Sequence, residues 1–99
     1  MTKIKKLADE IADELDSAKE YAENHLMYKA KGNDEWSKRF YSMAEDELRH
    51  SENLHDLAVE EINELKNVYT PPQEMLDKWE SDHRKFIEKT AWIKQMLAM

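Results

Sequence analysis

The sequence predicts an all-α fold in which two long helices form an antiparallel hairpin and a third helix follows. Three observations favour this class. The 99 residues include one glycine and two prolines, which leaves few residues suited to turns or sheets. Apolar residues recur at three- and four-residue steps through most of the chain, as they do on one face of a helix. The pattern breaks at residues 31–34 and 70–73, where the glycine and the prolines lie. We therefore expect one helical domain over residues 1–99.

The first helix is expected over about residues 2–30. Its apolar stripe consists of Ile4, Leu7, Ile11, Leu15, Ala18, Ala22 and Leu26. Gly32 can adopt the left-handed conformation that ends a helix, and Asn33 or Asp34 can cap the next helix with a side-chain oxygen. So short a connection makes the first two helices antiparallel neighbours.

The second helix is expected over about residues 35–69, and its apolar stripe contains two polar residues. The stripe consists of Trp36, Phe40, Met43, Glu47, His50, Leu54 and Leu57. Burial of an unpaired carboxylate is costly, so Glu47 and His50 need a partner on this face. A metal ion is one partner that satisfies both groups at once.

The third helix is expected over about residues 72–98. Thr70 and Gln73 have the spacing of a capping box, and proline is tolerated at the first helical position because that N–H has no helical partner. The apolar stripe consists of Leu76, Trp79, His83, Phe86, Thr90, Ile93 and Leu97. The sequence leaves open whether this helix folds back onto its own hairpin or packs on another subunit.

Composition and charge exclude several classes of partner. The net charge of −7 opposes phosphate binding, and the basic cluster is limited to Lys3, Lys5 and Lys6, so no nucleic-acid partner is expected. The absence of cysteine excludes disulfides and thiolate metal sites. Those lysines precede no apolar run, and no stretch is long and apolar enough to span a membrane. We expect a soluble, cytoplasmic protein with no membrane partner.

The register of the two helices predicts that a third ligand-type residue, Glu14, lies close to Glu47 and His50. On the first helix, Glu14 is the acidic residue most enclosed by apolar neighbours. In an antiparallel hairpin that turns near residue 32, facing residues have numbers that sum to about 64 or 65, and Glu14 and His50 meet this condition. Carboxylate-bridged di-metal bundles take a Glu from each of two helices and a Glu-x-x-His pair from each of the other two. A homodimer of this hairpin would complete such a four-helix bundle around two ions, and its donors suit iron or manganese.

At these residues the chain resembles the ferritin-like superfamily, and its length is similar to that of the half-length branch known as encapsulated ferritins. The resemblance covers roughly residues 10–60. Glu14 matches the first-helix ligand, Glu47 and His50 match the second-helix pair, and Tyr21 matches the tyrosine seven residues after the first ligand. The resemblance implies a di-iron ferroxidase centre, shared by two subunits, that oxidises Fe(II) to Fe(III) with dioxygen or peroxide. In that centre Glu47 would bridge the ions, Glu14 and His50 would complete the coordination, and Tyr21 would hydrogen-bond nearby and supply an electron.

The same resemblance has implications for ion uptake and for partners. Asp13 and Asp16 occupy positions at which the family has acidic residues that attract incoming iron. The implied partners are further copies of the chain, as a homodimer or a higher homo-oligomer, and an encapsulin shell, which is a protein nanocompartment. We find no shell-targeting peptide in residues 93–99.

Two other functions stay open on the sequence. The Glu and His residues could be a structural cluster in a non-enzymatic helical oligomerisation module, which would bind no metal. A rubrerythrin-like peroxide-reducing protein is disfavoured, because the chain has no cysteine to hold a rubredoxin iron.

The remaining histidines are expected to have structural roles. Glu52 and His55 lie at the flank of the second helix, where a surface position is expected. His83, three residues after Glu80, is favoured as a core or interface histidine, with a second metal site at this pair as the less favoured alternative. His25 is expected to hydrogen-bond across to the second helix.

Overall fold

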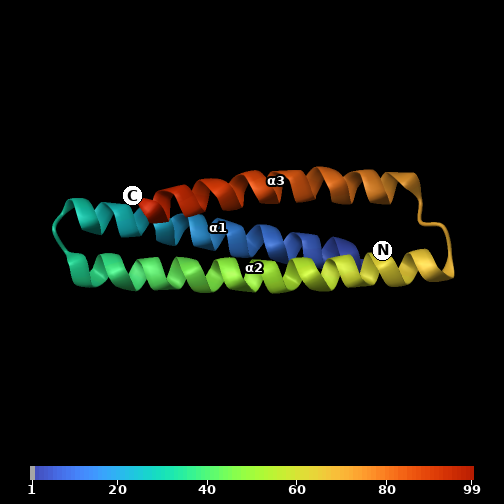
Figure 1. Ribbon diagram of the computed structural model, residues 1–99, viewed down its shortest axis with the longest axis horizontal. Helices are drawn as coiled ribbons and strands as arrows, with labels where there is room; N and C mark the ends of the chain where they lie inside the picture. Colours follow the sequence, from blue (N-terminus) through green and yellow to red (C-terminus); the bar gives the residue numbers. More distant parts are fainter. Residues whose placement is uncertain (1) are drawn as a thin grey trace.

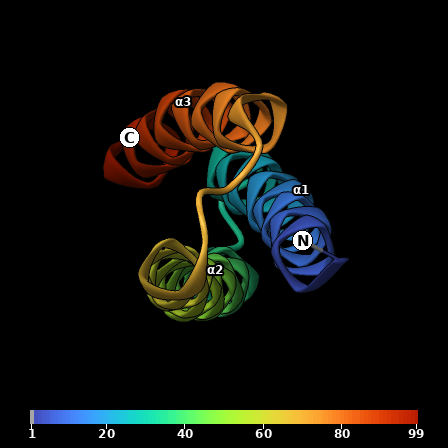
Figure 2. The same cartoon turned by 90° about the vertical axis from the view of Figure 1, so that its right-hand side faces the viewer.

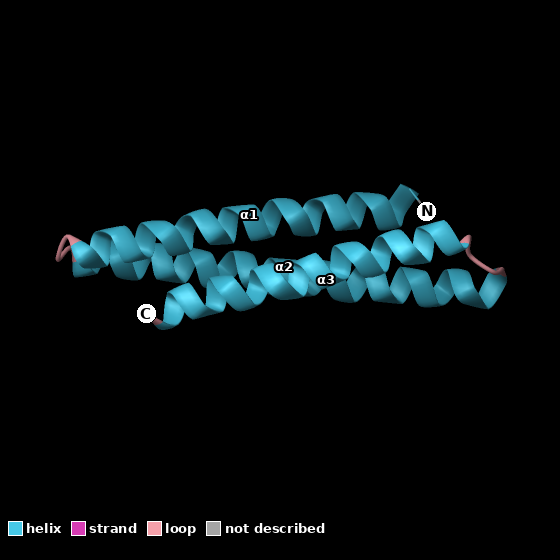
Figure 3. Cartoon of the chain, turned by 90° about the horizontal axis from the view of Figure 1, so that it is seen from above, coloured by secondary structure: helices cyan, strands magenta, loops and turns pink. Residues whose placement is uncertain are grey.

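The computed structural model describes residues 2–99, and over these residues it contains three helices and no strand. The helices are α1 (Thr2–Ala30), α2 (Asp34–Val68) and α3 (Gln73–Ala98). They run side by side along the long axis and give the molecule principal extents of 56 × 17 × 17 Å (Figures 1 and 3). The predicted all-α class is therefore confirmed, and the predicted helix ends agree with the observed ones to within one residue. None of these helices is both long enough and apolar enough to cross a lipid bilayer.

The turn between α1 and α2 has the chemistry that the sequence predicts. Gly32 has a φ of 76°, in the left-handed region that glycine adopts without steric strain. Asn33 caps α2, because its side-chain oxygen accepts a hydrogen bond from the backbone N–H of Trp36 at 3.1 Å. The backbone N–H of Asn33 in turn donates to the carbonyl of Tyr28 at 2.9 Å. These contacts fix the antiparallel hairpin and thereby the level at which residues of α1 and α2 face each other.

The buried seam between α1 and α2 has a heptad pattern. On α1 the buried apolar residues are Ile4, Ala8, Ile11, Leu15, Ala18 and Ala22, and on α2 the buried residues are Ser37, Ala44, Leu48, Ser51, Ala58 and Ile62. The small residues of α2 recur every seven positions, at 37, 44, 51 and 58. Small side chains at these positions let the two helix backbones approach closely.

The stripe predicted to be the core side of α2 is not the buried one. Trp36, Met43 and Leu57 are 48%, 39% and 52% exposed. The physical reason is that the small residues form the contact with α1. One of them directly follows each of these bulky residues, and the bulky side chains therefore lie at the edge of the seam. The prediction of a core-facing stripe was therefore wrong for the single chain. The stripe instead forms part of an apolar face that residues 2–99 leave uncovered.

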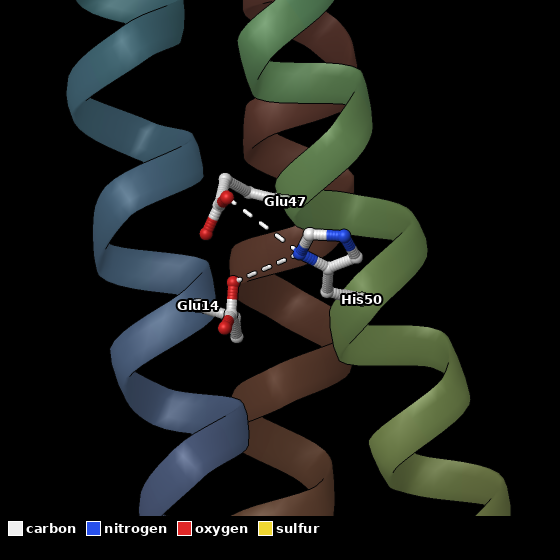
Figure 4. Close-up of side chains that lie close together, drawn as sticks. All are labelled: Glu14, Glu47 and His50. Atoms are coloured by element: carbon white, nitrogen blue, oxygen red, sulfur yellow. Dashed lines mark ion pairs between the residues drawn. The ribbon is translucent and has the colours of Figure 1, made fainter.

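We refer to this region as the uncovered face. It consists of Glu14, Tyr21 and Tyr28 of α1 together with Trp36, Phe40, Met43, Glu47, His50 and Leu57 of α2. Its aromatic residues contact one another across the hairpin: the ring of Tyr28 stacks on Phe40 with centroids 5.5 Å apart, and it lies 5.2 Å from the ring of Trp36. Figure 4 shows α3 behind the hairpin, on the side away from Glu14, Glu47 and His50.

The third helix folds back and packs mainly on α1, which answers the question that the sequence leaves open (Figure 2). Ile93, Met96 and Leu97 join the core formed by α1 and α2, and Trp79 and Phe86 pack against it while partly exposed. Lys89 of α3 pairs with Asp16 of α1. Because α3 sits on α1, a groove of about 520 Å³ remains between α2 and α3.

The start of α3 differs from the prediction. The helix begins at Gln73, its N-cap is Pro72 with φ −58° and ψ 139°, and no side chain caps it. Thr70 and Pro71 each precede a proline, and a residue before proline avoids the helical region. Thr70 thus lies two residues before the N-cap, and Gln73 donates its side-chain amide to Asp77 at 2.9 Å.

Candidate metal centre

Glu14 of α1 and Glu47 and His50 of α2 converge on the uncovered face, as the numbering of the hairpin predicts (Figure 4). His50 Nδ1 lies 3.6 Å from Glu14 Oε2 and 3.6 Å from Glu47 Oε1. One ligand atom from each residue lies within 4.8 Å of the other two. Ligand atoms bound to one ion by bonds of about 2.0–2.2 Å lie roughly 3–4 Å apart, so small side-chain rotations would place all three on a single cation.

One carboxylate oxygen of this group is buried without a partner. Among residues 2–99, Glu14 Oε2 is a buried side-chain oxygen that has no hydrogen bond. His50 Nδ1 lies 3.6 Å from this oxygen, which is beyond hydrogen-bonding distance. A buried acceptor without a partner is destabilising by roughly 1–3 kcal/mol, and by more when it is charged. A cation between the three side chains would satisfy this oxygen.

The electrostatics of the group also favour a cation. The neighbouring Glu14 carboxylate can accept a hydrogen bond from a protonated Glu47 and repels an ionised one, so it raises the pKa of Glu47 above its ordinary value of 4.5, and partial burial raises it further. The proximity of His50 opposes this shift. Two carboxylates held this close repel each other when both are ionised, and a proton or a positive ion between them removes the repulsion. A divalent cation would therefore compete with a proton for the two carboxyls.

The raised pKa gives a prediction for the metal-free protein. A carboxyl whose folded pKa exceeds its unfolded value contributes stability below the unfolded value, and this contribution is lost as the pH rises through the folded pKa. The metal-free chain should thus lose part of its stability above pH 4.5, whereas Glu47→Gln, which does not titrate, should not. Urea unfolding of both proteins in a chelator, from about pH 4 to pH 7, measures the difference. If Glu47→Gln gains no stability relative to the native chain over this range, the two carboxyls do not interact as described.

The donor set defines the metals that would fit. Two carboxylates and one imidazole are hard to borderline ligands, which suit iron and manganese better than soft ions such as Cu(I). Glu14 and Glu47 are 29% and 23% exposed, and His50 is 52% exposed. Each chain thus offers three ligands and leaves the other coordination positions open to water, to an oxidant or to another protein chain.

Asp13 and Asp16, for which an ion-attracting role is predicted, lie in different surroundings in the structure. Asp13 lines a depression of about 400 Å³ together with Glu14 and His50, so it lies on the approach to the group. Asp16 points toward the other side of α1 and pairs with Lys89 of α3. Its assignment to ion attraction has no support in this geometry. Glu10, which the sequence reasoning missed, lines the same depression, and its position four residues before Glu14 is the signal that could have found it.

Tyr21 lies on the uncovered face but not beside the carboxylates. It follows Glu14 by two helical turns, or roughly 10 Å along α1. Its ring packs against the core cluster and lies 6.1 Å from the ring of Phe40. Any electron that it supplies would have to cross this separation.

Two other histidine predictions have different outcomes. His25 is buried, and its Nδ1 lies 2.8 Å from Ser37 Oγ and 3.0 Å from the Ser37 carbonyl, so the predicted hydrogen bond to the second helix is confirmed. His55 was predicted to be on the surface, and this was wrong. It is half-buried and faces His83 of α3, because α3 folds back over this side of α2. The half-buried position of His83 between helices agrees with the interface role favoured for it.

Comparison with known proteins identifies no relative of this chain. No protein-family model, no curated protein and no solved structure matches this chain. The resemblance to ferritin-like proteins therefore stays a prediction from Glu14, Tyr21, Glu47 and His50. What the chain does has to be argued from the geometry of the group itself.

Proposed function

We propose that two copies of this chain bind a pair of iron ions through Glu14, Glu47 and His50 and oxidise Fe(II) to Fe(III). The single observation that carries the proposal is the buried Glu14 oxygen that has no hydrogen bond and faces a second carboxyl and an imidazole. With both carboxyls ionised, this arrangement is unfavourable without a cation and favourable with one. Manganese fits the same donors, and iron is preferred because the open coordination positions would admit an oxidant.

A second copy is proposed because one chain supplies only half of a di-metal ligand set. Each copy contributes two carboxylates and one imidazole, so two copies bring four carboxylates, whose charge matches that of two divalent ions. Glu14 and His50 lie near the middle of α1 and α2. A second hairpin packed along the uncovered face would therefore meet the first with both ligand sets at the same level.

The uncovered face has the side chains that an interface between copies needs. Trp36, Met43 and Leu57 are large apolar residues with exposed fractions of 39–52% in the single chain. Aromatic residues and methionine are enriched in the cores of protein interfaces, and exposed charges are depleted there. Packing of two such faces would also remove water from Glu14, Glu47 and His50, which strengthens their interaction with a cation.

In the proposed reaction, iron is the substrate and the chain supplies position and charge. Each Fe(II) gives one electron, so two ions supply the two electrons that reduce dioxygen to hydrogen peroxide, or hydrogen peroxide to water, with protons taken from solvent. The carboxylates of Glu14 and Glu47 would hold the ions close together and stabilise the higher charge of Fe(III). His50 would fix the position of the ions relative to α2, and Asp13 would raise the local cation concentration.

The oxidation assay tests this function. Fe(II) added in air to the native chain should be oxidised faster than in buffer alone, with the ferric absorbance as the readout. His50→Ala should lower the protein-dependent rate by roughly 100-fold, because it removes a ligand. Glu45→Ala serves as the control for a substitution on the same helix, since Glu45 is exposed and lies away from the group. If the native chain does not accelerate oxidation, or if both variants behave alike, the ferroxidase proposal fails.

The exposed aromatic residues also favour a second candidate, a helical oligomerisation module without redox activity. This candidate needs the uncovered face to be buried but needs no metal. Dimerisation of the native chain in a chelator, with no iron bound on titration, would favour it.

A further inference from the structure

A second group of ligand-type side chains lies between α2 and α3. His55 Nε2 of α2 is 3.3 Å from His83 Nδ1 of α3, and the two rings meet edge to face with centroids 4.7 Å apart. The ring of Trp79 lies 5.9 Å from that of His55 and 5.8 Å from that of His83. Packing against Trp79 restricts the orientation of both imidazoles. Two half-buried imidazole nitrogens from different helices thus face each other.

We propose that His55 and His83 bind a divalent transition-metal ion of the zinc type, which joins α2 to α3. Two imidazole nitrogens on one tetrahedral Zn²⁺, with bonds of about 2.0–2.1 Å, lie roughly 3.3 Å apart. The separation of His55 Nε2 and His83 Nδ1 has this value already. Both residues could therefore bind one ion with little movement of either helix, if each ring turns so that the two lone pairs point to a common position.

The protonation that zinc requires is compatible with the surroundings. His55 Nδ1 lies 3.4 Å from the Asp56 carboxylate, so it can carry the ring proton and leave Nε2 with a lone pair toward His83. A carboxylate behind a ligand histidine is a common way of fixing its tautomer. A shift of the His83 proton to Nε2 would free Nδ1 for the same ion.

Carboxylates are available to complete the coordination. Glu52 precedes His55 by three residues and Glu80 precedes His83 by three, which is the spacing that places Glu47 beside His50. Glu52 lines the groove between α2 and α3, where its carboxylate lies 3.9 Å from Lys94 Nζ. Glu80 is also exposed, and its carboxylate lies 3.8 Å from Arg84, so either glutamate would leave an exposed ion pair to reach the ion. Two histidines, one carboxylate and one water form a usual zinc coordination.

This site differs from the carboxylate-rich centre in position and in preferred metal. His55 lies on the side of α2 that faces α3, whereas His50 lies on the uncovered face. Imidazole-rich donors favour zinc over iron, because affinity for divalent ions rises along the first transition row and the histidines are softer ligands than carboxylates. Zinc bound here would connect two helices that otherwise make few contacts, so it should stabilise the packing of α3 on the hairpin.

Zinc titration with two variants tests the proposal. Equilibrium dialysis with Zn²⁺ alone, followed by metal analysis, should show that Glu47→Gln combined with His50→Ala still binds about one zinc per chain. Addition of His83→Gln to this protein should weaken zinc binding by roughly 100-fold or more. Co²⁺ in place of Zn²⁺ should give the strong visible absorption of a tetrahedral site, and this absorption should disappear with His83→Gln.

Separate outcomes distinguish this site from the first. Helical circular dichroism checks that the variants fold, and His55→Gln provides a second test if His83→Gln does not. Absence of zinc binding to the Glu47→Gln, His50→Ala protein would overturn the proposal. So would zinc binding that persists unchanged after His55→Gln or His83→Gln. Either result would leave the iron proposal untouched, because the Glu47→Gln, His50→Ala protein already lacks two of the three ligands of the first group.

Discussion

Glu47→Ala is expected to abolish iron binding and, with it, any tightening of the dimer by iron. The variant removes one of the three ligands that each chain supplies, which should lower iron affinity by at least roughly 100-fold. A ligand that binds only the dimer stabilises it by about 2.7 kcal/mol when its concentration is one hundred times its dissociation constant, and this corresponds to a dimer about 100-fold tighter. Sedimentation or light scattering over a range of protein concentrations, with and without Fe(II) under anaerobic conditions, measures the effect.

The comparison with the metal-free state is the control for this result. Without metal, the native dimer would bring four carboxylates together, so Glu47→Ala should not weaken the metal-free dimer and should relieve part of the repulsion. A matched control is Glu45→Ala, because Glu45 is an exposed glutamate on α2 outside the uncovered face. If Glu47→Ala retains full metal content in an intact dimer, the site is not shared between chains in the way proposed.

Trp36→Lys should separate the chains without touching a ligand. Trp36 is 48% exposed in the single chain, so the fold should tolerate the change. Lysine there would place an unpaired charge in the proposed interface and remove an aromatic side chain of the kind that often dominates binding energy. We expect the dimer dissociation constant to rise by roughly 100-fold or more, at a cost of about 3 kcal/mol.

Iron oxidation should fall together with the dimer in this variant, although Glu14, Glu47 and His50 are all present. Trp36 precedes Glu47 by eleven residues, or roughly 16 Å of helix, so the added charge should act on assembly and not on the ions directly. Ser42→Lys, which adds the same charge at an exposed position on the outer side of α2, is the control. A Trp36→Lys protein that is monomeric but oxidises iron at the native rate would show that one chain suffices.

The sequence was sufficient to predict the helices and the meeting of the three ligand-type residues. Gly32 and Asn33 fix a short turn, and a short turn between straight helices sets the level of every facing pair. The distance of 3.6 Å between His50 and Glu14 follows from that register. Local chemistry therefore carries enough information to group residues that are 36 positions apart.

The sequence was not sufficient to decide which face of α2 is buried within the chain. Both candidate stripes have helical spacing, and the one with Trp36 and Leu57 is the more hydrophobic. Hydrophobic patterning identifies a face that avoids water but does not say whether α1 or another molecule covers it. The residues of α2 that contact α1 are those that let the two helix backbones approach closely. This favours Ala44, Ser51 and Ala58 over larger side chains.

The hydrophobic pattern of the sequence also could not predict the position of α3 or the contacts that α3 makes. The pairing of Asp16 with Lys89 and of His55 with His83 depends on α3 packing mainly on α1. A four-residue loop that contains two prolines does not fix that choice. Both pairs join residues far apart in sequence, so no local sequence pattern predicts them.

Anaerobic titration with Fe(II), with the mass of the protein followed by light scattering in the same sample, tests the central claim most directly. We predict saturation at about two iron ions per two chains, a shift to the mass of a dimer over the same range, and a ferric absorbance on exposure to air. His50→Ala should show none of the three. Absence of iron binding, or binding that His50→Ala leaves unchanged, would contradict the proposed centre.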